Sequence, residues 1–184
     1  GGLDFKTGGT IGKPVRALAD GYISRIRVTN GSGYVLDVCY HNGYSTINRH
    51  LSAFLSPIAE RVKKLQYENE NWEVEIIPEP DEYPVKAGQR IALSGNTGYS
   101  FGPHLHLDVF ETETGDYIDP MPFFKKNLKD TRAPKADGIM LFPQLGKGVV
   151  SGSQENKTIL PNSEHPVEAW GVIGTGIKAY DYMD

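Results

Sequence analysis

The sequence is poor in several features that would direct a protein to a particular environment. It has one cysteine among 184 residues, so no disulfide can form within the chain. This residue, Cys39, lies in a strand-like run and is expected to be a small buried hydrophobe. No apolar run approaches the roughly 20 residues of a membrane-spanning helix. The 19 lysines and arginines are outnumbered by 23 aspartates and glutamates, which gives a net charge of −4. This balance argues against a nucleic-acid-binding protein, which needs a basic stripe to displace counterions.

Short strands, by contrast, are abundant. β-Branched and aromatic residues gather in the runs 22–28, 34–40, 44–49, 90–93 and 104–110. Pairs such as Asp20-Gly21 and Asn42-Gly43 mark turns between these runs. So many closely spaced turns predict a mostly-β protein, an antiparallel β-sandwich.

One helix is predicted to interrupt the strands. Ser56 is a suitable N-cap, and Pro57 suits the first helical position. Glu60 and Lys64 are spaced to form an ion pair on the outer side. The buried stripe is predicted to consist of Ile58, Val62 and Leu65. The segment looks like an insertion in the β fold.

Three parts of the chain differ in composition. Residues 1–124 hold the predicted sandwich, and the charged residues 125–136 are predicted to form a linker. Residues 137–184 are predicted to begin a second β-rich domain that is truncated here; alternatively they pack on the first domain. Trp72 and Trp170 are expected to lie in a core or an interface.

Two histidines stand out in the last predicted strand of the sandwich. His104 and His106 are two residues apart, so a strand points both imidazoles to one face, about 6–7 Å apart along the chain. The opposite face of the strand carries Leu105, Leu107 and Val109. Two imidazoles on one face of a strand, with apolar residues on the other face, could serve as a metal ligand and a neighbouring acid–base group. The spacing of the two histidines alone is a weak signal.

Two further residues belong with this pair. His50 ends a predicted strand in which Thr46, Asn48 and His50 are expected to share one face. Asp4 lies near the start of the chain, two residues after Gly2. Taken singly, Asp4 could be a turn residue and His50 a hydrogen-bonded strand histidine.

The order of these groups carries a family resemblance. Asp4, then His50, then Gly95-Asn-Thr-Gly98 followed by Gly-Pro-His-Leu-His106, resembles the lysostaphin/LytM-type zinc peptidases, which are peptidoglycan endopeptidases of the duplicated-hybrid-motif fold. The similarity extends from the first residue to about Phe124. Each motif is weak alone, and their order makes the resemblance specific.

The resemblance implies roles for particular residues. Asp4 and His106 would bind Zn²⁺, with a third ligand directly before Gly1, outside the sequence. His50 and His104 would be the catalytic histidines, and which of them takes up the proton is open. The implied substrate groove includes Asn48, Asn96, Tyr99 and Phe101. The family usually has Tyr at the position of Asn48 and Glu after the histidine motif, where this chain has Asp108, a candidate acceptor that fixes the tautomer of His106.

The expected function is hydrolysis of peptidoglycan stem peptides or cross-links by a metal-activated water, in the cell envelope, periplasmic or secreted. This location is inferred from the implied substrate, because no signal peptide is visible in the chain. One alternative is an inactive relative that binds and activates a cell-wall amidase. Another is a phosphocarrier of the same fold class, in which paired histidines carry phosphate.

Overall fold

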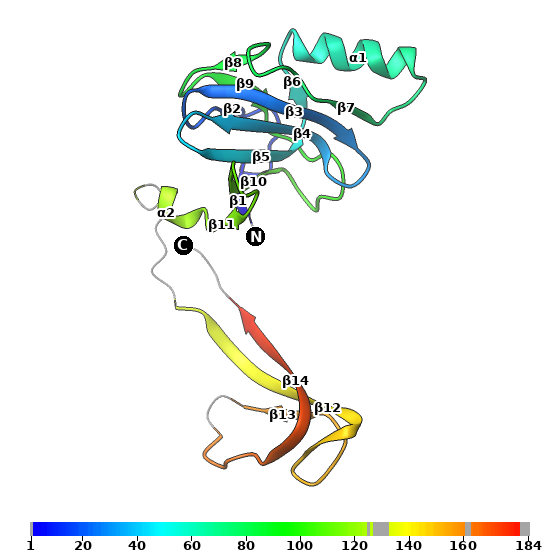
Figure 1. Cartoon of the computed structure of the whole chain (residues 1–184), viewed down its shortest axis with the longest axis vertical. Coiled ribbons are helices and arrows are strands. Elements are labelled where there is room, and N and C mark those ends of the chain that lie inside the picture. Colours follow the sequence, from blue (N-terminus) through cyan, green and yellow to red (C-terminus); the bar gives the residue numbers. More distant parts are fainter. Residues whose placement is uncertain (1, 125, 127–132, 161–162, 181–184) are drawn as a thin grey trace. The chain divides into compact units, whose positions relative to one another are not determined.

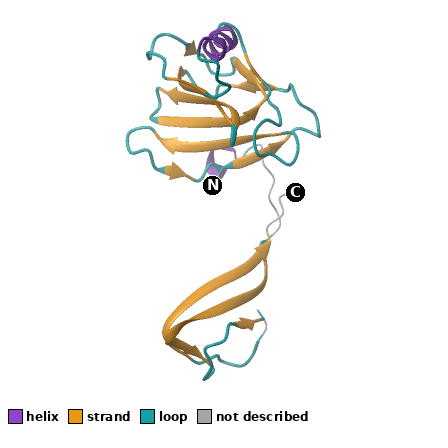
Figure 2. Ribbon diagram, turned by 90° about the vertical axis from the view of Figure 1, so that its right-hand side faces the viewer, coloured by secondary structure: helices purple, strands orange, loops and turns teal. Residues whose placement is uncertain are grey.

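The computed structural model describes residues 2–124, 126, 133–160 and 163–180. The chain divides into two compact units, Gly1–Phe124 and Lys125–Asp184. Strands and loops make up most of each unit, and α1 is the long helix of the first (Figures 1 and 2). No helix among the described residues is both long and apolar enough to cross a bilayer.

A large antiparallel sheet dominates the first unit. Its strands follow the order β1-β10-β5-β4-β3-β7, with β11 beside β10 and β8 beside β3, which makes eight strands among the described residues. Their bounds are β1 Leu3–Lys6, β3 Gly21–Thr29, β4 Gly33–Tyr40, β5 Tyr44–Leu51, β7 Val74–Ile76, β8 Pro84–Val85, β10 His104–Glu111 and β11 Tyr117–Ile118.

A second, smaller sheet packs on the first through a shared core. It has the order β2-β9-β6, with bounds Pro14–Arg16, Arg90–Leu93 and Ala53–Phe54. Side chains from both sheets and from α1 (Ile58–Glu68) form one hydrophobic cluster, which includes the fully buried Ile26, Leu36 and Leu51. The prediction of a mostly-β, antiparallel fold is confirmed, as is the buried position of Cys39. A short helix, α2 (Met121–Phe124), was not predicted.

The helix itself is where predicted, but its N-terminus is not. The helix begins at Ile58, and Pro57 occupies the N-cap without a side-chain hydrogen bond. Ser56 is therefore not the N-cap; its hydroxyl donates to the carboxylate of Glu60. Because Glu60 is engaged there, Lys64 pairs with Glu68 instead, at 3.7 Å between Nζ and Oε1. The predicted stripe is confirmed: its first two residues are buried and Leu65 packs on the core.

The second unit is a three-stranded antiparallel sheet of order β13-β12-β14. Its strands are β12 Lys135–Val150, β13 Lys157–Ile159 and β14 Ala169–Tyr180. Most of the predicted linker (residues 125 and 127–132) lies outside the described residues, and β12 begins within its last two positions. Trp170 and Trp72 are both more than half exposed, so neither is a core residue, and the alternative that they lie in an interface stays a prediction.

Two glycines hold the loop between β9 and β10 against the turn between β3 and β4. Gly98 has φ +74°, and a Cβ there would lie 2.4 Å from the backbone nitrogen of Gly33. A Cβ on Gly33 would in turn lie 2.1 Å from Oγ1 of Thr97. Only glycine permits both the left-handed backbone and this approach.

We predict that Gly98→Ala destabilises the first unit by about 2–4 kcal/mol, because it adds overpacking to the left-handed penalty. Gly115→Ala is the matched control, since Gly115 has φ +75° and no atom within 4 Å of its added Cβ. That control should cost only about 1 kcal/mol. Urea unfolding of both variants measures the difference, and equal losses would contradict the role of the close contact.

Candidate active site

Strand β10 brings together residues from both ends of the first unit. It lies between β1 and β5 in the large sheet, and its residue His106 is directly opposite Asp4 on one side and Arg49 on the other. Directly opposed residues in antiparallel strands project to the same face. The pairing therefore gathers the aspartate, the histidine and the arginine on one surface, although 102 positions separate the first two in the sequence.

The fourth residue, His50, reaches this surface by a departure from strand geometry. Its backbone has φ +60°, which is uncommon for any residue other than glycine. Strict alternation would place His50 on the face of Asn48, which is opposite buried Leu107. The left-handed residue turns the imidazole instead toward His104 and His106, at ring-centroid distances of 4.8 and 6.1 Å. The expectation that Thr46, Asn48 and His50 share one face is thus wrong.

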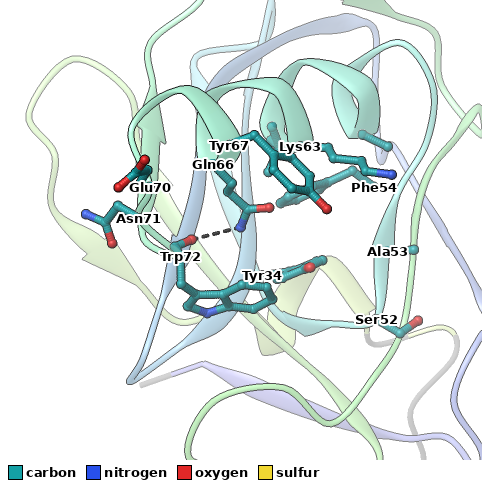
Figure 3. A pocket seen from close by; sticks show the side chains of 12 residues that line it. Tyr34, Ser52, Ala53, Phe54, Lys63, Gln66, Tyr67, Glu70, Asn71 and Trp72 are labelled. Carbon is teal, nitrogen blue, oxygen red and sulfur yellow. Dashed lines mark hydrogen bonds between the residues drawn. The ribbon is translucent and has the colours of Figure 1, made fainter.

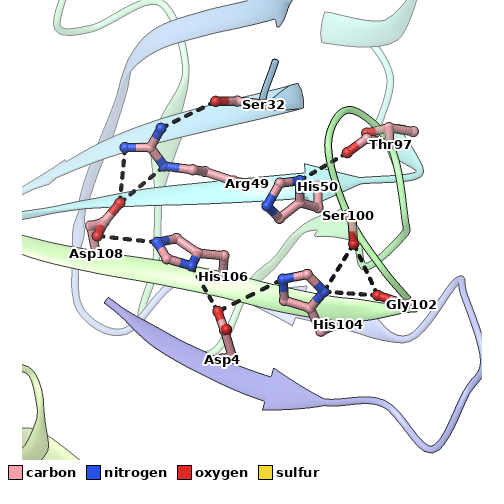
Figure 4. Close-up of polar contacts among 10 residues, drawn as sticks. All are labelled: Asp4, Ser32, Arg49, His50, Thr97, Ser100, Gly102, His104, His106 and Asp108. Atoms are coloured by element: carbon pink, nitrogen blue, oxygen red, sulfur yellow. Dashed lines mark hydrogen bonds and ion pairs between the residues drawn. The ribbon is translucent and has the colours of Figure 1, made fainter. Parts of the chain in front are cut away.

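Together the four side chains form a compact polar cluster (Figure 4). Nδ1 of His106 lies 2.7 Å from Oδ1 of Asp4, and Nε2 of His104 lies 3.7 Å from the same oxygen. Asp4, His104 and His106 each offer one possible ligand atom, and these three atoms lie within 4.8 Å of one another. Imidazole nitrogen and carboxylate oxygen are common zinc ligands in proteins, so this donor set fits a zinc ion.

Backbone carbonyls fix the tautomers of His50 and His104. Nδ1 of His50 donates to the carbonyl of Thr97 at 2.8 Å, and Nδ1 of His104 donates to the carbonyl of Gly102 at 2.8 Å. The hydroxyl of Ser100 lies 3.2 Å from the same nitrogen of His104. Since a carbonyl only accepts, each Nδ1 must carry a proton. In the neutral rings the lone pair is therefore on Nε2.

The environment of His50 also favours its neutral form. Burial lowers the pKa of His50 below its ordinary value, and the rings of His104 and His106 act in the same direction. These effects outweigh the Thr97 carbonyl, which favours the protonated ring. A neutral imidazole can accept a proton or a hydrogen bond at working pH.

A buried carboxylate orients His106 from its other side. Oδ1 of Asp108 lies 3.2 Å from Nε2 of His106, and Oδ2 accepts from Nε and Nη2 of Arg49 at 3.0 Å each. Nη1 of Arg49 donates to the hydroxyl of Ser32 at 3.2 Å. Gly2 packs on this contact, because a Cβ there would lie 2.7 Å from both Asp108 and His106. If Nε2–H of His106 donates to Asp108, the Nδ1 lone pair faces Asp4, as a metal ligand requires.

The four residues expected to line the substrate groove do not lie together: one is buried, and three are exposed. Asn48 is not at the cluster: it is buried on the other face and donates to the carbonyl of Leu36 at 3.1 Å. Asn96, Tyr99 and Phe101 are exposed on the loop between β9 and β10, the loop that holds both histidine tautomers.

Sequence reasoning missed several residues of the site. Arg49 and Ser32 gave no signal, because an arginine in a strand and a serine in a turn are common. The carbonyls of Thr97 and Gly102 belong to the glycine-containing turns that were noticed, but a sequence pattern does not specify a backbone acceptor. The spacing of Asp108 from His106 did indicate its contact.

The chain is similar in sequence to several known proteins. No protein-family model matches the chain. The glycyl-glycine endopeptidase ALE-1 of Staphylococcus capitis is 35% identical over 130 residues, which are 67% of this chain and 28% of that protein. Lysostaphin of Staphylococcus staphylolyticus is 34% identical over 130 residues, 67% of this chain and 22% of that protein. The chain thus spans less than a third of the length of these relatives.

A solved structure has a similar sequence identity to the chain and covers a similar share of it. The catalytic domain of lysostaphin from Staphylococcus simulans is 31% identical, with a TM-score of 0.48, over 67% of this chain and 77% of that domain. On the identity with ALE-1 and lysostaphin, the chain belongs to the lysostaphin/LytM-type metallopeptidase family.

Proposed function

We propose that this chain is a zinc-dependent endopeptidase that hydrolyses peptide bonds in peptidoglycan stem peptides or cross-links, and that it acts in the cell envelope. The observation that carries the proposal is the clustering of Asp4, His50, His104 and His106 on one surface, with the hydrogen bonds that orient each histidine. The names of its relatives support a hydrolase role, since they are a glycyl-glycine endopeptidase and peptidoglycan endopeptidases.

Asp4 and His106 are the proposed zinc ligands, with the third directly before Gly1, as the family motif implies. A bound zinc ion would polarise the substrate carbonyl and lower the pKa of a water molecule toward about 7. The chain's own contribution is to place two imidazoles with fixed tautomers beside that position. Nε2 of His50 or of His104 takes up the proton of the attacking water. The other ring donates a hydrogen bond to the developing oxyanion when its Nε2 is also protonated, since its Nδ1 proton is held by a backbone carbonyl.

The alternative is an inactive relative that binds an amidase. Such a protein has no chemical need for two histidines with fixed tautomers beside a histidine–aspartate pair. The arrangement therefore favours the enzyme. Zinc content and the release of soluble muropeptides from purified sacculi, both measured on the full-length protein, distinguish the two.

We predict that His106→Ala and Asp4→Ala each lose zinc and at least 99% of hydrolysis, since each removes a proposed ligand. His41→Ala, which changes an exposed turn histidine, should keep both properties. Elemental analysis and muropeptide release provide the two measurements. Undiminished zinc in either ligand variant would refute its assignment.

His104→Ala should keep about one zinc per chain and lower kcat by about 10²–10⁴-fold, the usual contribution of a general acid or base. The reason is that its Nδ1 is engaged with Gly102 while Nε2 faces the cluster. Loss of zinc in this variant would make His104 a ligand. Full activity would remove it from the mechanism.

Asp108→Asn should weaken zinc binding about 10–100-fold, because the amide no longer serves as the charged acceptor for His106. Asp37→Asn is the matched control: Asp37 is equally buried, and its carboxylate accepts from Arg27 at 2.7 and 2.8 Å. Both substitutions remove a buried carboxylate beside an arginine, so both should reduce stability. Zinc titration and thermal unfolding separate the effects, and equal zinc affinities in the two variants would show that Asp108 has only a structural role.

A further inference from the structure

A large cavity lies beneath helix α1, away from the histidine cluster. Its volume is about 620 Å³, within the range of small-molecule sites. Figure 3 shows Lys63, Gln66 and Tyr67 of the helix on one side, with Tyr34 and Trp72 on the other. The cavity is therefore lined by the predicted helical insertion and by the sheet that it covers.

Aromatic side chains dominate the walls. Tyr34 stacks on Phe54 at 5.1 Å between ring centroids, with an interplanar angle of 10°. Trp72 lies 5.7 Å from the ring of Tyr34 but is 55% exposed, and Tyr67 is 75% exposed. Large aromatic side chains exposed around a hollow are typical of binding sites, because each offers an apolar face and a polar edge.

The polar groups of the cavity suit a neutral ligand. Lys63 and Glu70 contribute one charge of each sign. Nε2 of Gln66 donates to the carbonyl of Trp72 at 2.8 Å, which leaves the side-chain oxygen of Gln66 available. Asn71, whose Oδ1 accepts from the backbone of Glu73, lies at the rim with its side chain directed away from the hollow (Figure 3). A side-chain amide and aromatic faces together match a pyranose ring, which has an apolar C–H face and a rim of hydroxyl and acetamido groups.

A hydrogen-bonded residue links the wall of the cavity to the candidate active site. The backbone nitrogen of Tyr34 donates to Oγ1 of Thr97, whose carbonyl orients His50. Ser52 and Ala53, which line the cavity, follow His50 in the chain by two and three positions. Thr97 is thus the connection between the cavity wall and His50, while the cavity itself is lined by none of the clustered residues.

We infer that this cavity binds an acetamido sugar of the glycan strand to which the hydrolysed peptide is attached. The inference rests on the proposed function for the identity of the polysaccharide, since stem peptides are covalently linked to glycan. The aromatic rings stack on the pyranose face, and the side-chain oxygen of Gln66 accepts a hydrogen bond from the acetamido N–H. The helical insertion thereby gives the enzyme a subsite for the sugar in addition to its site for the peptide.

The two tryptophans of the chain permit a direct test. In a Trp170→Phe background Trp72 is the only tryptophan, so its fluorescence reports the cavity. Titration with a β-1,4-linked N-acetylglucosamine tetramer should change this fluorescence saturably. Tyr67→Ala in the same background should weaken binding at least tenfold. Tyr117→Ala, which removes a tyrosine that is 58% exposed outside the cavity, should leave it unchanged.

Three results would overturn the inference: no saturable change, equal affinity in Tyr67→Ala and Tyr117→Ala, or saturation by a free stem tetrapeptide but not by the sugar. His106→Ala separates this inference from the proposed function. It should bind the tetramer normally and release no muropeptides. If the unmodified protein binds the tetramer and has no hydrolytic activity, the proposed function fails and the sugar site stands. If it hydrolyses sacculi without binding the tetramer, only the sugar site fails.

Discussion

The register of β10 between β1 and β5 is the constraint on which the site depends. One row of paired residues contains Asp4, His106 and Arg49, and backbone hydrogen bonds hold this row in place. Because side chains alternate along a strand, a slip of one residue would turn His106 into the core and a leucine to the surface. The buried Leu107 and Val109 oppose such a slip, so burial of the apolar face also fixes the polar face.

A second constraint acts through the loop between β9 and β10. Its backbone provides the carbonyls that bind Nδ1 of His50 and of His104, and its Gly98 packs on the turn before β4. Both imidazoles are therefore oriented by main-chain atoms, which no side-chain substitution removes. Orientation before substrate binds reduces the reorganisation needed during the reaction.

The sequence was informative where the structure follows regular periodicity. Alternation in β10 correctly placed His104 and His106 on one face, and the helical spacing correctly placed Ile58 and Val62 in the core. The same rule failed at His50, because one left-handed residue reverses the direction of its side chain.

Contacts between distant segments were harder to foresee. The pairing of Arg49 with Asp108 depends on strand register, and the exposure of Trp72 depends on a cavity that α1 covers only in part. Residue types alone specify neither. By contrast, the order of short motifs singled out four residues that do lie close together, each on β1, β5 or β10 of the large sheet.

The helical insertion, which lines the cavity, is built on different strands from the residues proposed for hydrolysis. The residues that would carry out hydrolysis come from β1, β5 and β10, and their register does not involve α1 or β7. The insertion joins this framework after β6 and returns as an edge strand paired with β3. Because β7 pairs with β3, two strands from β5, substitutions in α1 can alter the shape of the cavity without moving the row that contains His106. Thr97 is the point of contact between them, since its hydroxyl accepts from Tyr34 and its carbonyl orients His50. Substitutions in the insertion can therefore change which ligand the cavity binds without changing the residues proposed for hydrolysis. Thr97 is the residue through which a change in the cavity would affect His50.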